Sequence, residues 1–227
     1  MKLNEPAPAP LQALAVTTPS WESLDGVLVG YERTHGDEPW KRMVEPIRIV
    51  VGRNGMGWGR GMHPLPPSEG PVKREGDGRA PAGIFRLSST FGYSPVEEVS
   101  WIRMPYQQIT ADLLCINDPG SVCYNRIVDA VRENADWETH EEMLRADGRY
   151  QYGIIVDHNM DPAIAGKGSC IFMHVWGGFS QATGGCTAMA LNHLERLLSL
   201  LDPVAMPVLI QLPGPEYARL KVPWRLP

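Results

Sequence analysis

The sequence predicts a mostly β fold, either a β-sandwich or a curled mixed sheet, with a few helices. Glycine and proline are frequent, at 23 and 21 of 227 residues, which favours many turns and short strands over a helical bundle. Short runs rich in β-branched residues recur along the chain. Late in the chain, one segment has the three- and four-residue apolar spacing of an amphipathic helix. We therefore expect a β domain with that helix packed against it.

The first half of the chain supplies several strand candidates. Residues 11–18 are apolar and are expected to form a first edge strand, and residues 26–32, 40–51, 83–87, 101–109 and 113–116 are further candidates. Asn54-Gly55 is a turn signal, and residues 56–62 are too rich in glycine to form a regular element. A loop rich in proline and charge follows over residues 64–77.

The spacing of apolar residues changes in the second half of the chain. Apolar residues scattered among charges predict one or two short helices, or a helical loop, over residues 125–145. Strands are predicted at 152–157, 171–176 and 206–212. The predicted amphipathic helix is ended by Asp202-Pro203, and its apolar stripe comprises Met189, Leu191, Leu194, Leu197, Leu198 and Leu201.

Length and charge limit the possibilities. A chain of 227 residues is long enough for one good core, and we expect an extended spacer over residues 1–20 followed by a single domain over 21–227. The net charge of −5 argues against a nucleic-acid partner. No run approaches the roughly 18 apolar residues of a membrane span. Met1 to Pro6 contains no apolar signal-peptide core, so the chain is either cytosolic or the mature part of an exported protein.

The stretch from Ile171 to Thr187 contains the residues that carry chemistry. His174 lies in a predicted strand, and Cys186 follows after eleven intervening residues, so the two side chains can reach neighbouring strands. A thiolate is a far better nucleophile than a thiol, and a nearby imidazole can generate it. Gly184 and Gly185 allow a sharp turn that aims backbone N–H groups at one point, as an oxyanion hole requires.

This stretch resembles the L,D-transpeptidase catalytic domain, also called the YkuD domain, whose motif is a histidine, a loop and then Ser/Thr-x-Gly-Cys. Thr183-Gly184-Gly185-Cys186 matches the second part and His174 the first, with a loop typical of a short-loop branch. Residues 79–85 and 152–159 are similar to strands upstream of the motif in that family. The resemblance covers about residues 45–212 and implies a YkuD-like fold.

The resemblance implies a cysteine acyltransferase that acts on peptidoglycan stem peptides without a metal or organic cofactor. Cys186 would be the nucleophile and His174 the base, with the Val175 carbonyl orienting the imidazole. The N–H groups of Gly184, Gly185 and Cys186 would form the oxyanion hole. The resemblance also favours export to the periplasm, and we expect a monomer. The rival functions are a carboxypeptidase or amidase that hydrolyses stems, and a non-catalytic wall-binding module.

Two positions depart from the family pattern. The family usually has a histidine where this chain has Gly184, and an Arg or Asn where it has Ala188. In members with Arg, that side chain meets a substrate carboxylate, which an alanine cannot do. A nearby cation can take over this role, and the candidates are Arg53, Arg60, Lys73 and Arg74.

The remaining candidates have structural alternatives. Tyr152, His158, Trp176 and Thr183 are the candidates to flank the substrate. Core packing and loop anchoring explain Tyr152 and Trp176 equally well, and a surface turn explains His158 better. A disulfide between Cys115 and either Cys170 or Cys123 is possible in an oxidising compartment, and buried thiols are the alternative. A zinc site is the rival use of the reactive residues, with Cys170, His174 and Cys186 joined by His158 or His193.

Overall fold

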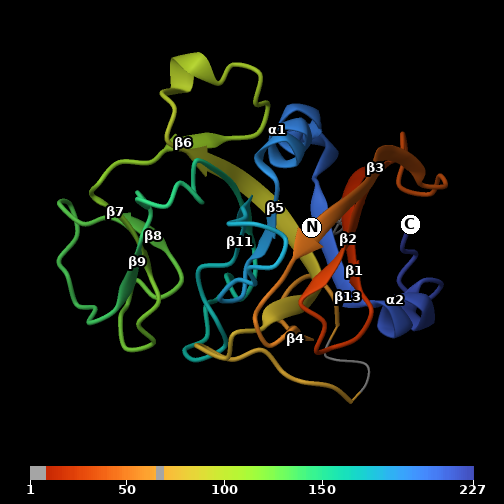
Figure 1. Cartoon of the computed structure of the whole chain (residues 1–227), viewed down its shortest axis with the longest axis horizontal. Coiled ribbons are helices and arrows are strands. Elements are labelled where there is room, and N and C mark those ends of the chain that lie inside the picture. The colour runs from red at the N-terminus through yellow and green to blue at the C-terminus, as the bar shows by residue number, and fades with distance from the viewer. Residues whose placement is uncertain (1–8, 65–68) are drawn as a thin grey trace, which may run out of the picture.

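The computed structural model describes residues 9–64 and 69–227, and Figure 1 shows a large curled sheet with a small separate sheet beside it. The mostly β fold with a mixed, curled sheet is therefore confirmed. The large sheet contains ten strands. They are β1 (Gln12–Thr18), β2 (Asp25–Glu32), β3 (Lys41–Val50), β4 (Met56–Trp58), β5 (Ala80–Gly92), β6 (Tyr106–Gln108), β10 (Tyr152–Val156), β11 (Phe172–Val175), β12 (Thr187–Met189) and β13 (Val208–Pro213).

One long strand closes the large sheet on itself. The strand order is β10-β11-β12-β3-β2-β1-β13-β5-β4, and β5 also pairs with β10. β5 has 13 residues, so it can pair with β13 through Gly83 to Arg86 and with β10 through Leu87 to Gly92. A sheet that closes in this way has few free edges, and its interior must be filled by side chains.

Apolar side chains from the strands fill that interior. Leu14, Ile49, Phe85, Ile154 and Leu209 are all fully or almost fully buried in one core. Burying each such side chain contributes roughly 1.5–3 kcal/mol relative to leaving it in water. The strands near the reactive residues are therefore held by the main core of the molecule.

Two α-helices follow the last reactive residue in the chain. The predicted amphipathic helix is confirmed as α1 (Leu191–Leu200), which buries Leu194, Leu197 and Leu198 against the core. A second helix, α2 (Gly214–Leu220), follows β13 directly, and the sequence analysis did not predict it. Two short 3₁₀ turns, η1 (Val96–Glu98) and η2 (Pro203–Ala205), complete the helical elements. Within the described residues, no helix is long and apolar enough to cross a membrane.

The prediction of helix over residues 125–145 is wrong. This segment contributes two strands, β8 (Ile127–Asp129) and β9 (His140–Glu142), which pair on either side of β7 (Leu113–Ile116) in a three-stranded antiparallel sheet. Figure 1 shows this small sheet set apart from the large one. Pairing with β7 provides the backbone hydrogen bonds that a helix would have made locally.

The prediction of an N-terminal spacer and an edge strand is also corrected. β1 lies between β2 and β13 in the interior of the large sheet, and Ala13, Leu14 and Val16 have no exposed surface. Residues 1–8 lie outside the described part of the chain, so the spacer prediction is untested there. The β domain therefore begins at least as early as Gln12.

Candidate active site

Strand register brings His174 and Cys186 to one side of the sheet. β11 and β12 are parallel neighbours, with His174 opposite Ala188, and Cys186 lies two residues before Ala188. Residues two apart on an extended chain face the same side, so the thiol projects on the side of the imidazole. The two strands are neighbours as expected, but the connection is a crossover between parallel strands and not a simple return.

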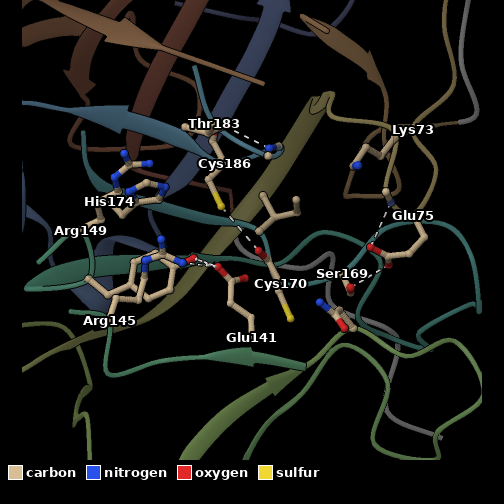
Figure 2. Close-up of a pocket in the computed structure, with 16 residues that line it drawn as sticks. Lys73, Glu75, Glu141, Arg145, Arg149, Ser169, Cys170, His174, Thr183 and Cys186 are labelled. Carbon is tan, nitrogen blue, oxygen red and sulfur yellow. Dashed lines mark hydrogen bonds and ion pairs between the residues drawn. The ribbon is translucent and has the colours of Figure 1, made fainter. Parts of the chain in front are cut away.

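Both side chains line a cavity of about 220 Å³ between the large and small sheets. Figure 2 shows Cys186 and His174 pointing into it, with Arg145 and Arg149 on the side of His174 and Lys73 and Glu75 on the opposite side. The cavity is lined by Lys73, Glu75, Gly76, Asn117, Glu141, Arg145, Arg149, Tyr150, Ser169, Cys170, Ile171, His174, Thr183, Gly184, Gly185 and Cys186.

The Cys186 thiol is buried and neutral in this structure. Its Sγ atom accepts a hydrogen bond from the Phe172 N–H at 3.3 Å and donates to the Cys170 carbonyl at 3.6 Å. Burial, and then the nearby Glu141 carboxylate, raise the pKa of Cys186 to about 12. The thiol must therefore lose its proton to a base during attack.

His174 has the tautomer that a base for this thiol would need. Its Nδ1 atom lies 2.8 Å from the Val175 carbonyl oxygen, which can only accept, so Nδ1 carries the proton and Nε2 has a free lone pair. Burial, together with the charges of Arg145 and Arg149, lowers the pKa of His174 to about 4, against the hydrogen bond to Val175. The Tyr150 ring packs edge-on against the imidazole, with 5.2 Å between ring centroids. The predicted contact between His174 and Val175 is present.

The turn before Cys186 is fixed by Thr183. Its hydroxyl donates to the Cys186 carbonyl at 2.6 Å and accepts from the Gly185 N–H at 3.1 Å. Because the Gly185 N–H is already used, it is not available as an oxyanion donor in this conformation. Among the described residues, the N–H groups of Gly184 and Cys186 have no hydrogen-bond partner. These two N–H groups therefore remain free to donate to an oxyanion.

Gly184 and Gly185 differ in whether their positions could accept a side chain. Gly185 has a φ of +155° and a side chain there would lie 2.9 Å from the Arg79 carbonyl oxygen, so this position needs glycine. A side chain at Gly184 would have open space, with Arg53 nearest at 3.9 Å. At the other departure from the family pattern, Ala188 is fully buried, which leaves no room for an arginine.

The cations beside the reactive pair are not the ones expected, apart from Lys73. Arg145 and Arg149 line the cavity, whereas Arg53, Arg60 and Arg74 do not. Both arginines come from the turn that follows β9. Arg145 was predicted to lie in a helix, and no role was predicted for Arg149. A clue was present in the sequence, because residues 145–149 read Arg-Ala-Asp-Gly-Arg, a charged turn immediately before a predicted strand.

Three predicted substrate contacts lie away from the cavity. His158 is almost fully buried, and its nitrogens are occupied by the Arg60 N–H and the Lys167 carbonyl. Tyr152 is buried in β10 with its ring edge-on to Trp101, and Trp176 lies past the end of β11. None of the three lines the cavity, while Thr183 does.

The cysteines form one disulfide, between Cys115 and Cys170. This pairing is one of the two that the sequence left open, and Cys123 is a buried free thiol. The disulfide removes Cys170 from the set of zinc ligands that the sequence allowed, since a thiolate is needed to bind the metal. It also connects β7 of the small sheet to the residue whose carbonyl accepts from Cys186.

The wall opposite the arginines is rich in hydrogen-bond acceptors. Glu75 accepts from the hydroxyls of Tyr124 and Ser169. The side-chain oxygen of Asn117 is buried and has no hydrogen-bond partner among the described residues. An unpaired buried acceptor of this kind is energetically costly.

The arrangement suits nucleophilic acyl transfer. A thiol, a correctly protonated imidazole and two open N–H groups face a cavity with polar walls. A scan against protein-family models and a search of curated proteins found no match to this chain. The functional assignment therefore depends on the chemistry of this cavity and on the resemblance of the Thr183–Cys186 motif.

Proposed function

We propose that the protein is an exported peptidoglycan L,D-transpeptidase of the YkuD type. The observation that carries the proposal is the pairing of Cys186 with His174 in one cavity, with Nδ1 of the imidazole bonded to the Val175 carbonyl. That bond leaves Nε2 as the acceptor for the thiol proton.

In the first half-reaction, Nε2 of His174 takes the proton of Cys186 as Sγ attacks an L-centre carbonyl. The N–H groups of Gly184 and Cys186 stabilise the negative charge that develops on the carbonyl oxygen. Collapse of the tetrahedral intermediate breaks the L-to-D peptide bond. The imidazolium returns its proton to the departing amine, and an acyl thioester remains on Cys186.

In the second half-reaction, an amine of another stem attacks the thioester. His174 takes the amine proton and returns it to Sγ as the thiolate departs, which restores the neutral pair. Water in place of the amine gives hydrolysis, so exclusion of water separates a transpeptidase from a carboxypeptidase or amidase.

The donor bond is proposed to be the junction between L-Ala, the first residue of the stem, and the D-Glu that follows it. Common family members cut after the third residue, and many hold a substrate carboxylate with the arginine two residues past the cysteine. Here Ala188 is buried at that position, so the substrate must be held differently. The L-Ala junction has the same L-to-D stereochemistry and would give crosslinks that begin at residue one.

The disulfide supports the proposed location. Disulfides form and persist in oxidising compartments and are rare in the cytosol. The bond between Cys115 and Cys170 lies beside the reactive thiol and connects two walls of its cavity. A periplasmic or other exported location accounts for it, and within that location the proposed partner is the stem peptide of the wall.

The test is mass spectrometry of purified wall fragments after incubation with the protein, with the Cys186→Ala variant as control. Crosslinked fragments that join residue one of one stem to the amine of another support the whole proposal. Crosslinks that all join third residues would contradict the L-Ala donor, and shortened stems without crosslinks would identify a hydrolase. No change in the fragments, from protein whose Cys186 still reacts with iodoacetamide, would contradict action on stem peptides.

A further inference from the structure

Three cationic side chains line the cavity, and two of them are already neutralised. Lys73 donates to the Asp77 carboxylate at 2.5 Å and to the Arg74 carbonyl at 2.8 Å. Arg145 makes a two-pronged pair with Asp147, at 3.0 and 2.6 Å, and also lies 3.5 Å from Glu141. Neither group is free to hold an incoming anion without losing these partners.

Arg149, the third cation, is much less engaged. Its Nε atom lies 3.3 Å from Asp147, a carboxylate that it shares with Arg145. One terminal nitrogen donates to the side-chain oxygen of Gln181 at 2.9 Å, and among the described residues the other has no hydrogen-bond partner. A carboxylate can displace the neutral amide oxygen and accept from both terminal nitrogens.

The backbone holds Arg149 in a fixed position relative to the base. The Arg149 carbonyl accepts from the Val175 N–H at 3.0 Å, and the Val175 carbonyl accepts from Nδ1 of His174. Two consecutive hydrogen bonds therefore link the main chain at Arg149 to the imidazole. Figure 2 shows the guanidinium beside His174, on the cavity side away from Glu75.

We propose that Arg149 is a specificity-determining residue that binds a carboxylate of the acyl donor next to the scissile bond. It supplies the cation that Ala188 cannot. The identity of the donor as a stem peptide depends on the function proposed above, but the anion subsite itself does not. The subsite can therefore be tested with small reagents that react with Cys186.

The first experiment compares two alkylating reagents of similar size on the intact protein. Iodoacetate carries a carboxylate and iodoacetamide is neutral, and both displace iodide from the Cys186 sulfur to form a thioether. An anion subsite beside Cys186 raises the ratio of the iodoacetate rate to the iodoacetamide rate. We expect Arg149→Gln to lower this ratio by about tenfold, which is the effect of an electrostatic interaction that shifts a pKa by one unit. Arg149→Lys keeps the positive charge and should restore part of the ratio.

The matched control is Arg132→Gln, which removes the same charge from an arginine that is 84% exposed and does not line the cavity. An unchanged ratio in Arg149→Gln, or an equal change in Arg132→Gln, would overturn the subsite. A slower reaction with both reagents, at a constant ratio, would mean that Arg149 only positions His174 and would also contradict the proposal.

The second experiment identifies the group that binds. Stem peptides are offered with the carboxylate beside the scissile bond either free or converted to the amide. We expect Arg149→Gln to raise KM at least tenfold for the free acid and to leave the amide unaffected. Equal effects on the two peptides would contradict a donor carboxylate at Arg149. If the parent protein acts on neither peptide while the reagent ratio still depends on Arg149, the proposed function fails and the anion subsite stands.

Discussion

The two sheets of this protein contribute different parts of the cavity. The large sheet carries Cys186 and His174 beside strands whose side chains fill the main core. The small sheet carries Glu141, with Arg145 just past its last strand, and its β7 residues Leu113 and Cys115 share a second apolar cluster with Phe172 and Cys186. The nucleophile thus lies where the two sheets pack together, and the charges that modify it and the base come from the small sheet and the turn that follows it. We infer that the small sheet adjusts a reaction centre that the large sheet builds.

The largest effect is expected from the nucleophile itself. Cys186→Ala should reduce turnover at least about 10⁴-fold, as removal of other catalytic nucleophiles does, with an unchanged circular dichroism spectrum. The two free thiols also allow a direct comparison of the sheets, because Cys123 has a similarly low exposure but does not line the cavity that contains His174. Iodoacetamide followed by peptide mapping should label Cys186 before Cys123. Faster labelling of Cys123 would contradict the assignment of the nucleophile.

Loss of the base should be the next largest effect. His174→Ala should lower turnover by about 10²- to 10⁴-fold, the usual contribution of a general base. His158→Ala is the comparison, since that histidine has both nitrogens bonded within the fold and lies outside the cavity. Near-normal turnover from a folded His174→Ala variant would mean that another group removes the thiol proton.

The large sheet was mostly predictable from the sequence, whereas in the small sheet only β7 was. The runs at β10 and β13 are apolar and contain several β-branched residues, so the local sequence is enough to identify them as strands. The Thr-Gly-Gly-Cys turn and the preceding histidine also identified the reactive pair. The central position of β1 had no local signal, because it depends on pairing with β13 almost 200 residues later.

The charged wall of the cavity was missed for a related physical reason. The mixture of apolar and charged side chains over residues 125–145 is equally compatible with a short helix. Only pairing with β7 makes β8 and β9 strands. The turn between β9 and β10 places Arg145 and Arg149 in the cavity that Cys186 also lines. Their role follows from tertiary contacts that no spacing in the sequence encodes, whereas the resemblance directed attention to cations nearer the front of the chain.

Removal of the disulfide that links the two sheets should have an effect of intermediate size on stability and on the reactivity of Cys186. The Cys115–Cys170 disulfide closes a loop of 55 residues, for which chain entropy predicts a contribution of about 4 kcal/mol to stability. Cys115→Ala with Cys170→Ala should therefore lower Tm and slow the alkylation of Cys186, because the Cys170 carbonyl contacts its sulfur. Cys123→Ala is the control for loss of a buried cysteine. An unchanged Tm and alkylation rate in the double variant would show that the sheets are held together by other contacts.

The pH dependence of alkylation should separate the contributions of base and thiol. With a pKa of about 12, the thiolate fraction of Cys186 rises about tenfold per pH unit between about pH 7 and pH 9. In His174→Ala the alkylation rate should follow that slope. The parent protein should show a shallower slope, because His174, with a pKa of about 4, is neutral throughout this range and is available to take the thiol proton as the sulfur attacks. Equal slopes in the two proteins would mean that His174 does not act on Cys186.

The smallest predicted effect tests whether the small sheet adjusts the nucleophile. The Glu141 carboxylate, held by the Tyr150 hydroxyl and Arg145, is the nearby charge that most strongly raises the pKa of Cys186. Glu141→Gln removes that charge while keeping the size and an acceptor for Tyr150. The pKa of the thiol should fall, and alkylation near pH 8 should accelerate by up to about tenfold, which corresponds to one pKa unit.

The matched control is Glu142→Gln, because Glu142 is the next residue on β9, is exposed and does not line the cavity. It removes an equal charge from the same strand, so any general effect of net charge on the reagent appears in both variants. Acceleration confined to Glu141→Gln would support electrostatic control of Cys186 by the small sheet. If Glu141→Gln is instead slower, with an unchanged Tm, the carboxylate assists the reaction by keeping Tyr150 against His174, and the small sheet acts on the base and not on the thiol.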